Sequence, residues 1–143
     1  MTTEAMWTAI RARFDDAFAL AKAVEPTIEL IIAGANRKSV RLDPETTYQR
    51  AYFRHVGARR VGATETAPEE NQGIIYQDFL APLQVGDDTL VALFDAVRPA
   101  FRTGADGLEF EEAPHLRDGR ADGSHWLAVA SFPFVRREIV AAA

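Results

Sequence analysis

The segment 126–134, Trp-Leu-Ala-Val-Ala-Ser-Phe-Pro-Phe, is apolar at both sets of alternating positions. Successive side chains of a β-strand point to opposite faces, so Leu127 and Val129 share one face and the larger, aromatic set lies on the other. A strand that is apolar on both faces needs neighbouring strands and cover on each side. We therefore expect this segment to be a central strand, which commits the chain to a layered fold built around a sheet.

Two other segments show the three- and four-residue apolar spacing of an amphipathic helix. The first covers residues 3–21 and is closed by Pro26. Its apolar stripe comprises Trp7, Ile10, Phe14 and Phe18. The second follows the turn at Gly86, Asp87 and Asp88, where an aspartate can cap the helix, and reaches Phe101. Pro99 is expected to kink or end its last turn.

Four further segments have the composition of strands, namely 27–33, 48–56, 74–83 and 108–114. Pro82 ends the third of these, because proline cannot donate to a strand ladder. The order is therefore helix, strand, strand, strand, helix, strand, strand. At 143 residues the chain is expected to form one domain. We predict an α+β fold, with a mostly antiparallel sheet of about five strands and two helices packed on one face.

Residues 57–72 form the least regular part of the chain, and we expect a long hairpin loop there between the second and third strands. Arg59 and Arg60 stand at its near end, and Glu69 and Glu70 at its far end. A structureless loop of this length inside a compact domain is commonly functional or disordered. Such a loop either reaches a neighbouring subunit or extends into solvent.

The strand predicted at 48–56 has one face of mixed character. Alternation places Tyr48, Arg50, Tyr52 and Arg54 on that face. An aromatic and cationic face suits a surface that a neighbouring subunit partly covers. It equally suits a solvated face on which arginine stems lie along tyrosine rings.

Composition argues against several classes of function. The net charge of −5 disfavours general nucleic-acid binding, which depends on clustered basic residues. The absence of cysteine removes disulfides and thiolate metal sites. No apolar run approaches the roughly 18 residues that a membrane-spanning helix needs.

No residue pattern in the chain indicates an active site. His55, His115 and His125 are far apart, and none stands at metal-ligand spacing with an acid. Ser124 and His125 are neighbours in sequence, which is not the arrangement of a nucleophile and its base. We therefore expect no catalytic, cofactor-binding or metal-binding residues, and we expect that the protein is not an enzyme.

The element order and a few punctuating residues resemble the tail-terminator and tail-completion proteins of long-tailed bacteriophages and related gene-transfer particles. Members of that family begin with a helix and an asparagine-containing loop that leads to a proline and a tyrosine. A strand marked by a glycine, a tyrosine and a proline follows, then a glycine turn, a helix ending in Phe and a last strand of Trp-to-Pro-Phe type. The matching residues here are Asn36, Pro44, Tyr48, Gly73, Tyr76, Pro82 and Gly86.

The resemblance implies a structural protein of virion assembly. Such proteins form a six-subunit ring that caps the tail tube, stops its polymerisation and provides the surface for head–tail joining. The implied partners are further copies of the chain in a homohexameric ring, the tail tube protein and a head-side stopper or connector. DNA would only pass through the lumen, and no membrane is involved. The implied location is the head-proximal end of the virion tail, and the host cytoplasm during assembly.

In such a ring each subunit meets its neighbours through two different patches. The first candidate patch is the hairpin around Arg59, Arg60, Glu69 and Glu70, and the second is the face of Tyr48, Arg50, Tyr52 and Arg54. Two alternatives remain. One is another head–tail connector or stopper, which would bind the portal or adaptor ring instead of the tube end. The other is a small ligand-binding α+β protein, which would be a stable monomer with a deep apolar pocket.

Overall fold

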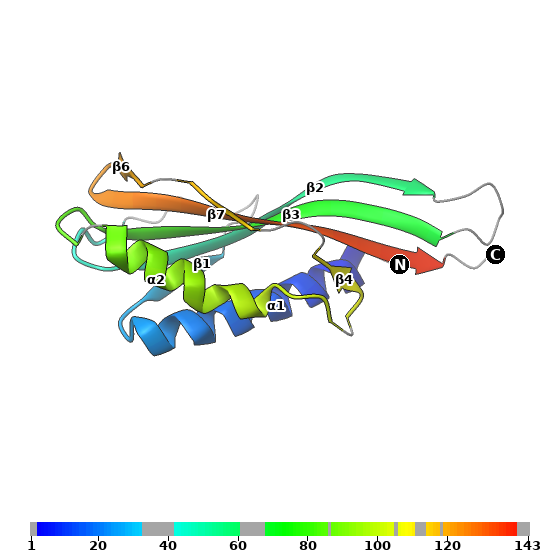
Figure 1. The fold of residues 1–143 in the computed structure, drawn as a ribbon, viewed down its shortest axis with the longest axis horizontal. Helices are drawn as coiled ribbons and strands as arrows, with labels where there is room; N and C mark the ends of the chain where they lie inside the picture. Colours follow the sequence, from blue (N-terminus) through cyan, green and yellow to red (C-terminus); the bar gives the residue numbers. More distant parts are fainter. Residues whose placement is uncertain are drawn as a thin grey trace.

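In the computed structural model, two helices lie along one face of a long, twisted sheet (Figure 1). The structure describes residues 3–32, 42–60, 68–85, 87–104, 106–110, 114–117 and 119–139. The elements are α1 (Thr3–Val24), β1 (Glu29–Ile32), β2 (Tyr48–Arg60), β3 (Pro68–Pro82), α2 (Asp87–Val97), the 3-10 helix η1 (Arg98–Ala100), β4 (Leu108–Glu109), β5 (His115–Leu116), β6 (Arg120–Asp122) and β7 (His125–Ile139). The predicted α+β class, with two helices and a mostly antiparallel sheet, is confirmed.

The details of the sheet differ from the prediction. Over the described residues it has seven strands, in the order β1-β2-β3-β7-β4, and β5 and β6 also pair with β7. β1 runs parallel to β2, and the other pairings are antiparallel. The strand predicted at 108–114 is only β4, and residues 111–113 lie outside the described part. Sequence reasoning missed β5 and β6, because strands of two or three residues are too short to show an alternating pattern.

β7 is the central strand that its two apolar faces predict. β3 pairs along one edge, and β4, β5 and β6 pair along the other. On the helix side the ring of Phe132 packs against Phe94 of α2 and against Phe101, with centroid distances of 6.0 and 4.3 Å. On the opposite side Leu127 is buried with Leu80. β7 also continues to Ile139, five residues beyond the predicted end at Phe134, because its polar end still pairs with β3.

The helices bury the predicted apolar stripes against the sheet. In α1, Ile10 and Phe14 are fully buried, while Trp7 and Phe18 pack at the margin of the core. Figure 1 shows α1 and α2 side by side under the strands, and they share this core. Burial of one stripe per helix supplies most of the stability of such a layer, since isolated helices of this length are marginal in water.

α2 ends as its proline predicts. The α-helix stops at Val97, and Pro99 lies in η1, where the backbone N–H of Phe101 donates to the carbonyl of Arg98 at 3.1 Å. A proline cannot continue the α-helical hydrogen-bond ladder, so the last turn tightens. The tighter turn leaves Ala100 and Phe101 buried beneath the sheet.

The loop predicted over residues 57–72 is much shorter than expected. β2 continues to Arg60 and β3 begins at Pro68, so most of that stretch is paired strand, and residues 61–67 lie outside the described part. A bulge between His55 and Gly57 shifts the register of the pair. The ends of β2, β3 and β7 project together beyond the helices (Figure 1). Strand pairing satisfies the backbone here, which composition alone did not reveal.

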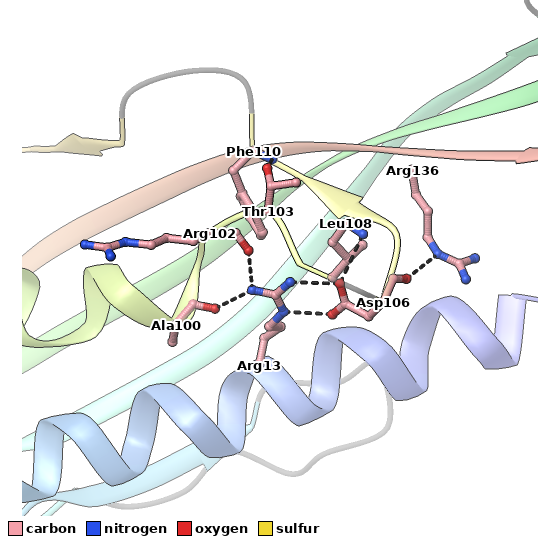
Figure 2. A network of polar contacts seen from close by, with 8 residues as sticks. All are labelled: Arg13, Ala100, Arg102, Thr103, Asp106, Leu108, Phe110 and Arg136. Atoms are coloured by element: carbon pink, nitrogen blue, oxygen red, sulfur yellow. Dashed lines mark hydrogen bonds and ion pairs between the residues drawn. The ribbon is translucent and has the colours of Figure 1, made fainter.

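Arg13 of α1 fixes the segment between η1 and β4 (Figure 2). Its Nε and Nη2 each donate to a carboxylate oxygen of Asp106 at 2.8 Å. Its Nη1 donates to the carbonyl oxygens of Ala100 and Arg102 at 2.8 and 2.6 Å. The guanidinium also lies over the ring of Phe110, 5.5 Å from its centroid. Hydrogen bonding from Arg13 lowers the pKa of Asp106 below its usual value. These contacts hold β4 in place beside β7.

Candidate subunit-contact surface

The face of the sheet opposite the helices, here called the outer face, is the candidate contact surface. Alternation along β2 places Tyr48, Arg50, Tyr52 and Arg54 on this face. The intervening Ala51 and Phe53 pack toward the helices. The four residues predicted as the second contact candidate therefore share one face, but the structure gives them different surroundings.

Tyr48 is part of the interior. Only 5% of the residue is exposed, and its side chain packs with Leu80 and Leu127. Its hydroxyl accepts a hydrogen bond from the backbone N–H of Asp43 at 2.9 Å, and its ring meets His125 edge-on at a centroid distance of 5.6 Å. Tyr48 thus anchors the start of β2 inside the fold and presents little surface to a partner.

Arg50 is paired within the chain. Its Nε and Nη2 donate to one oxygen of Asp78 at 2.9 and 2.7 Å, and the hydroxyl of Tyr52 donates to the other oxygen at 3.3 Å. Burial raises the pKa of Asp78, against the opposing effect of Arg50. Burial, followed by the charge of Asp78, raises the pKa of Tyr52 to about 12. The Arg50–Asp78 pair therefore adds little net charge to the outer face, and Tyr52 keeps its proton at neutral pH.

Beside this pair the outer face is hollowed. The depression measures about 540 Å³ and is lined chiefly by Tyr52, Arg54, Tyr76, Arg117, Arg120 and Ser131. We call it the tyrosine–arginine hollow. The rings of Tyr52 and Tyr76 stack on one another, 4.9 Å apart and 16° from parallel. None of the ion pairs between described residues involves Arg54, Arg117 or Arg120. The hollow therefore combines aromatic surface with three arginines.

A second, more apolar depression adjoins the hollow at Ile74. It measures about 300 Å³, and Val56, Pro133 and Val135 contribute to its lining. Val56 lies at the bulge of β2 and is 51% exposed. Aromatic, arginine and aliphatic surface side by side is the composition of protein–protein contact sites, in which tyrosine and arginine are enriched.

The charged residues of the first candidate lie in strands. Arg59 and Arg60 end β2 and stand opposite Glu70 and Glu69 in the β2–β3 register. Glu70 is only 3% exposed and accepts a hydrogen bond from Nε of Arg137 at 3.2 Å. Nη1 of Arg137 donates onward to Glu109 at 2.7 Å. Glu70 therefore ties β3 to β7 and β4 within one subunit.

Sequence reasoning missed Tyr76, Arg117 and Arg120. Tyr76 had a detectable signal, because alternation along β3 puts it on the same face as Asp78 and Leu80. The two arginines had none. Arg117 follows β5 and Arg120 begins β6, both of which are too short to recognise, and the two side chains approach Tyr52 only through the pairing of β5 and β6 with β7.

His125 and Ser124, whose residue types are often catalytic in other proteins, make structural contacts here. His125 is buried, with Nε2 at 3.0 Å from the carbonyl oxygen of Thr46 and Nδ1 at 3.0 Å from Oγ of Ser124. Ser124 and His125 thus do meet, which their adjacency did not predict. The contact lies at the exposed turn marked by Gly123, with φ of 60°. Because Nε2 faces a carbonyl oxygen, which can only accept, Nε2 is the donor of that hydrogen bond.

Within the described residues, no three His, Asp or Glu side chains gather as a metal site would require. No helix in that part of the chain is long and apolar enough to cross a bilayer. His55 and His115 are both exposed and lie on different strands, β2 and β5.

Comparison with known proteins gives a structural match and no family or sequence match. No family profile matches the chain. No curated protein matches the chain in sequence. Several solved structures match, and one of them is similar over 99% of this chain and 99% of its own, with 13% identity and a TM-score of 0.67. At 13% identity this likeness concerns the fold alone.

Proposed function

We propose that the chain is a structural subunit of a ring that caps the tail tube of a long-tailed bacteriophage or gene-transfer particle. In that role it ends tail polymerisation and provides the surface for head–tail joining. The proposal rests on the element order and punctuating residues shared with tail-terminator proteins. It is compatible with the observed order, in which an N-terminal helix, a long hairpin, a second helix and a last long strand follow one another.

The observation that carries the proposal is the character of the outer face. Tyr52 and Tyr76 are half-buried, Arg54 is exposed, and no helix of the described part of the chain covers them. A ring subunit needs two different patches that fit each other on successive copies. A sheet face with stacked tyrosines and exposed arginines has the composition of such a patch.

The charge of the chain fits the same role. A net charge of −5 gives weak attraction for phosphate, and a lumen through which DNA slides must not hold it tightly. The long β2–β3–β7 projection offers a second surface, beyond the helices, for the tail tube protein or the head-side connector (Figure 1).

The test is sedimentation velocity over a concentration series, alone and with a purified tail tube protein of a long-tailed phage, followed by negative-stain imaging of the largest species. The proposal expects a closed six-fold ring with a central hole, bound to the end of the tube. A chain that stays monomeric in both conditions contradicts it. A ring that binds the portal or adaptor and ignores the tube identifies a stopper instead.

A further inference from the structure

A second surface of the chain has unexplained apolar exposure. Leu83 and Val85 precede α2, Val91 lies within it, and these residues are 49%, 42% and 46% exposed. Asp88 and Asp95 are exposed on the same helix, three residues before and four residues after Val91. Residues at such intervals share one helix face. We call this surface the acidic ridge, formed by Leu83, Val85, Asp88, Val91 and Asp95.

The acidic ridge lies on a helix that carries only negative side-chain charges. α2 contains Asp87, Asp88 and Asp95 and no basic residue. Asp87 is engaged by Nε1 of Trp126, which donates to it at 2.5 Å. Asp88 and Asp95 take part in none of the ion pairs between described residues. The ridge is thus an apolar strip flanked by two carboxylates.

The tyrosine–arginine hollow has the complementary chemistry. Its arginines, Arg54, Arg117 and Arg120, can each receive a carboxylate, and guanidinium–carboxylate pairs are the geometrically specific kind. The adjoining apolar depression, with the exposed Val56 at its edge, can cover aliphatic side chains. Charge and apolar surface therefore match in kind between the two surfaces.

We propose that the acidic ridge of one copy docks on the tyrosine–arginine hollow of the next. This inference rests on the proposed function, because it names the surfaces through which successive ring subunits meet. The contact is heterologous, since ridge and hollow are different surfaces of the same chain. The ridge lies on α2 and the hollow on the outer face. Arg117 borders both, because it also lines a depression with Asp87 and Val91, so Arg54 and Arg120 are the arginines that only the hollow offers to a neighbour.

A nucleic-acid strand fits the hollow less well than an acidic protein surface. The two tyrosine rings stack on each other instead of standing apart to receive bases, and the whole chain is acidic. Three arginines supply far fewer phosphate contacts than the charged grooves of strand-binding proteins. Nucleic-acid binding is nevertheless a defined outcome of the test.

The experiment uses the full chain in sedimentation velocity under the conditions in which the wild type associates. One variant reverses the hollow, Arg54→Glu with Arg120→Glu, and another reverses the ridge, Asp88→Arg with Asp95→Arg. Matched controls change net charge equally at exposed α1 positions, Arg11→Glu with Lys22→Glu and Asp15→Arg with Asp16→Arg. Circular dichroism verifies that each variant is folded. A labelled oligothymidylate tests the hollow for strand binding.

We expect each double reversal to weaken association by about tenfold or more. The variant that carries all four substitutions should recover association, because the charges are then complementary again. Association should also weaken as NaCl rises from about 0.05 to about 0.5 M. The docking is wrong if the reversals behave like their controls, if the combined variant is not rescued, or if the hollow binds the oligonucleotide instead. If the wild type never associates, both the proposed function and the proposed contact are wrong. If the ring forms in spite of both reversals, only the contact between ridge and hollow is wrong.

Discussion

The ring of Phe134 lies over Gly73, its partner in the β3–β7 register. A Cβ atom at Gly73 would stand 2.5 Å from Cζ of Phe134 and 3.0 Å from the carbonyl oxygen of Arg54. Both neighbours are fixed, the first by core packing and the second by the backbone of β2. Glycine at this position therefore lets an aromatic ring close the core where the sheet begins to project beyond the helices.

Gly73→Ala should destabilise the protein by about 1–3 kcal/mol, because the added methyl group overpacks a fixed ring. Urea unfolding followed by circular dichroism measures the change. Adding Phe134→Leu to Gly73→Ala should recover part of the loss, since the smaller side chain leaves room. Gly57→Ala is the control, because no atom lies within 4 Å of a Cβ there. Equal losses for the two glycine variants would contradict this account.

Arg13→Lys should lower the free energy of unfolding by about 2–3 kcal/mol. Lysine cannot reproduce the two parallel bonds to Asp106 together with the bonds to two backbone carbonyls, and these groups are partly buried. The same change at the exposed Arg11 should stay within about 0.5 kcal/mol. Chemical denaturation of both variants decides the matter, and similar values for the two would show that Arg13 is not a clamp.

The Arg13–Asp106 pair also predicts a pH dependence. The pKa of folded Asp106 lies below its usual 3.8, so between the folded and unfolded values the unfolded chain binds more protons. The stabilisation from this group is therefore present above about pH 4 and lost as the pH falls through the folded pKa. The stability difference between wild type and Asp106→Asn should shrink as the pH falls below about 4.

Thermal unfolding from about pH 7 to about pH 2.5 tests this expectation. Asp78 acts in the opposite direction, because its pKa is raised and its protonation favours the folded state. The comparison with Asp106→Asn cancels that contribution, which both proteins share. Asp122→Asn, which removes a carboxylate at an exposed position on β6, is the matched control. A difference for Asp106→Asn that stays constant with pH would remove the proposed linkage.

The sequence predicted the elements whose signal is local. The apolar stripes of α1 and α2 and the two apolar faces of β7 are periodic patterns within single segments, and each segment lies where its pattern requires. Pro99 ended α2 for a reason that needs only its own chemistry. The prediction of a loop over residues 57–72 was wrong at both ends. Residues 57–60 and 69–72 have loop-like composition but pair with each other, and residues 68–72 also pair with β7.

What only the tertiary structure decided is which distant residues meet. Gln49 and Gln77 have the polar side chains of surface residues, yet both are 0% exposed. Nε2 of Gln49 donates a hydrogen bond to Oε1 of Gln77 at 2.5 Å. Arg117 joins Tyr52 in one hollow although 65 positions separate them. Periodicity within a segment determines which side chains must leave water, so the sequence determined the helices and the central strand. Strand register and edge pairing determine which side chains become neighbours across the sheet. Register and pairing depend on the assembly of all the strands, so no single segment reveals them.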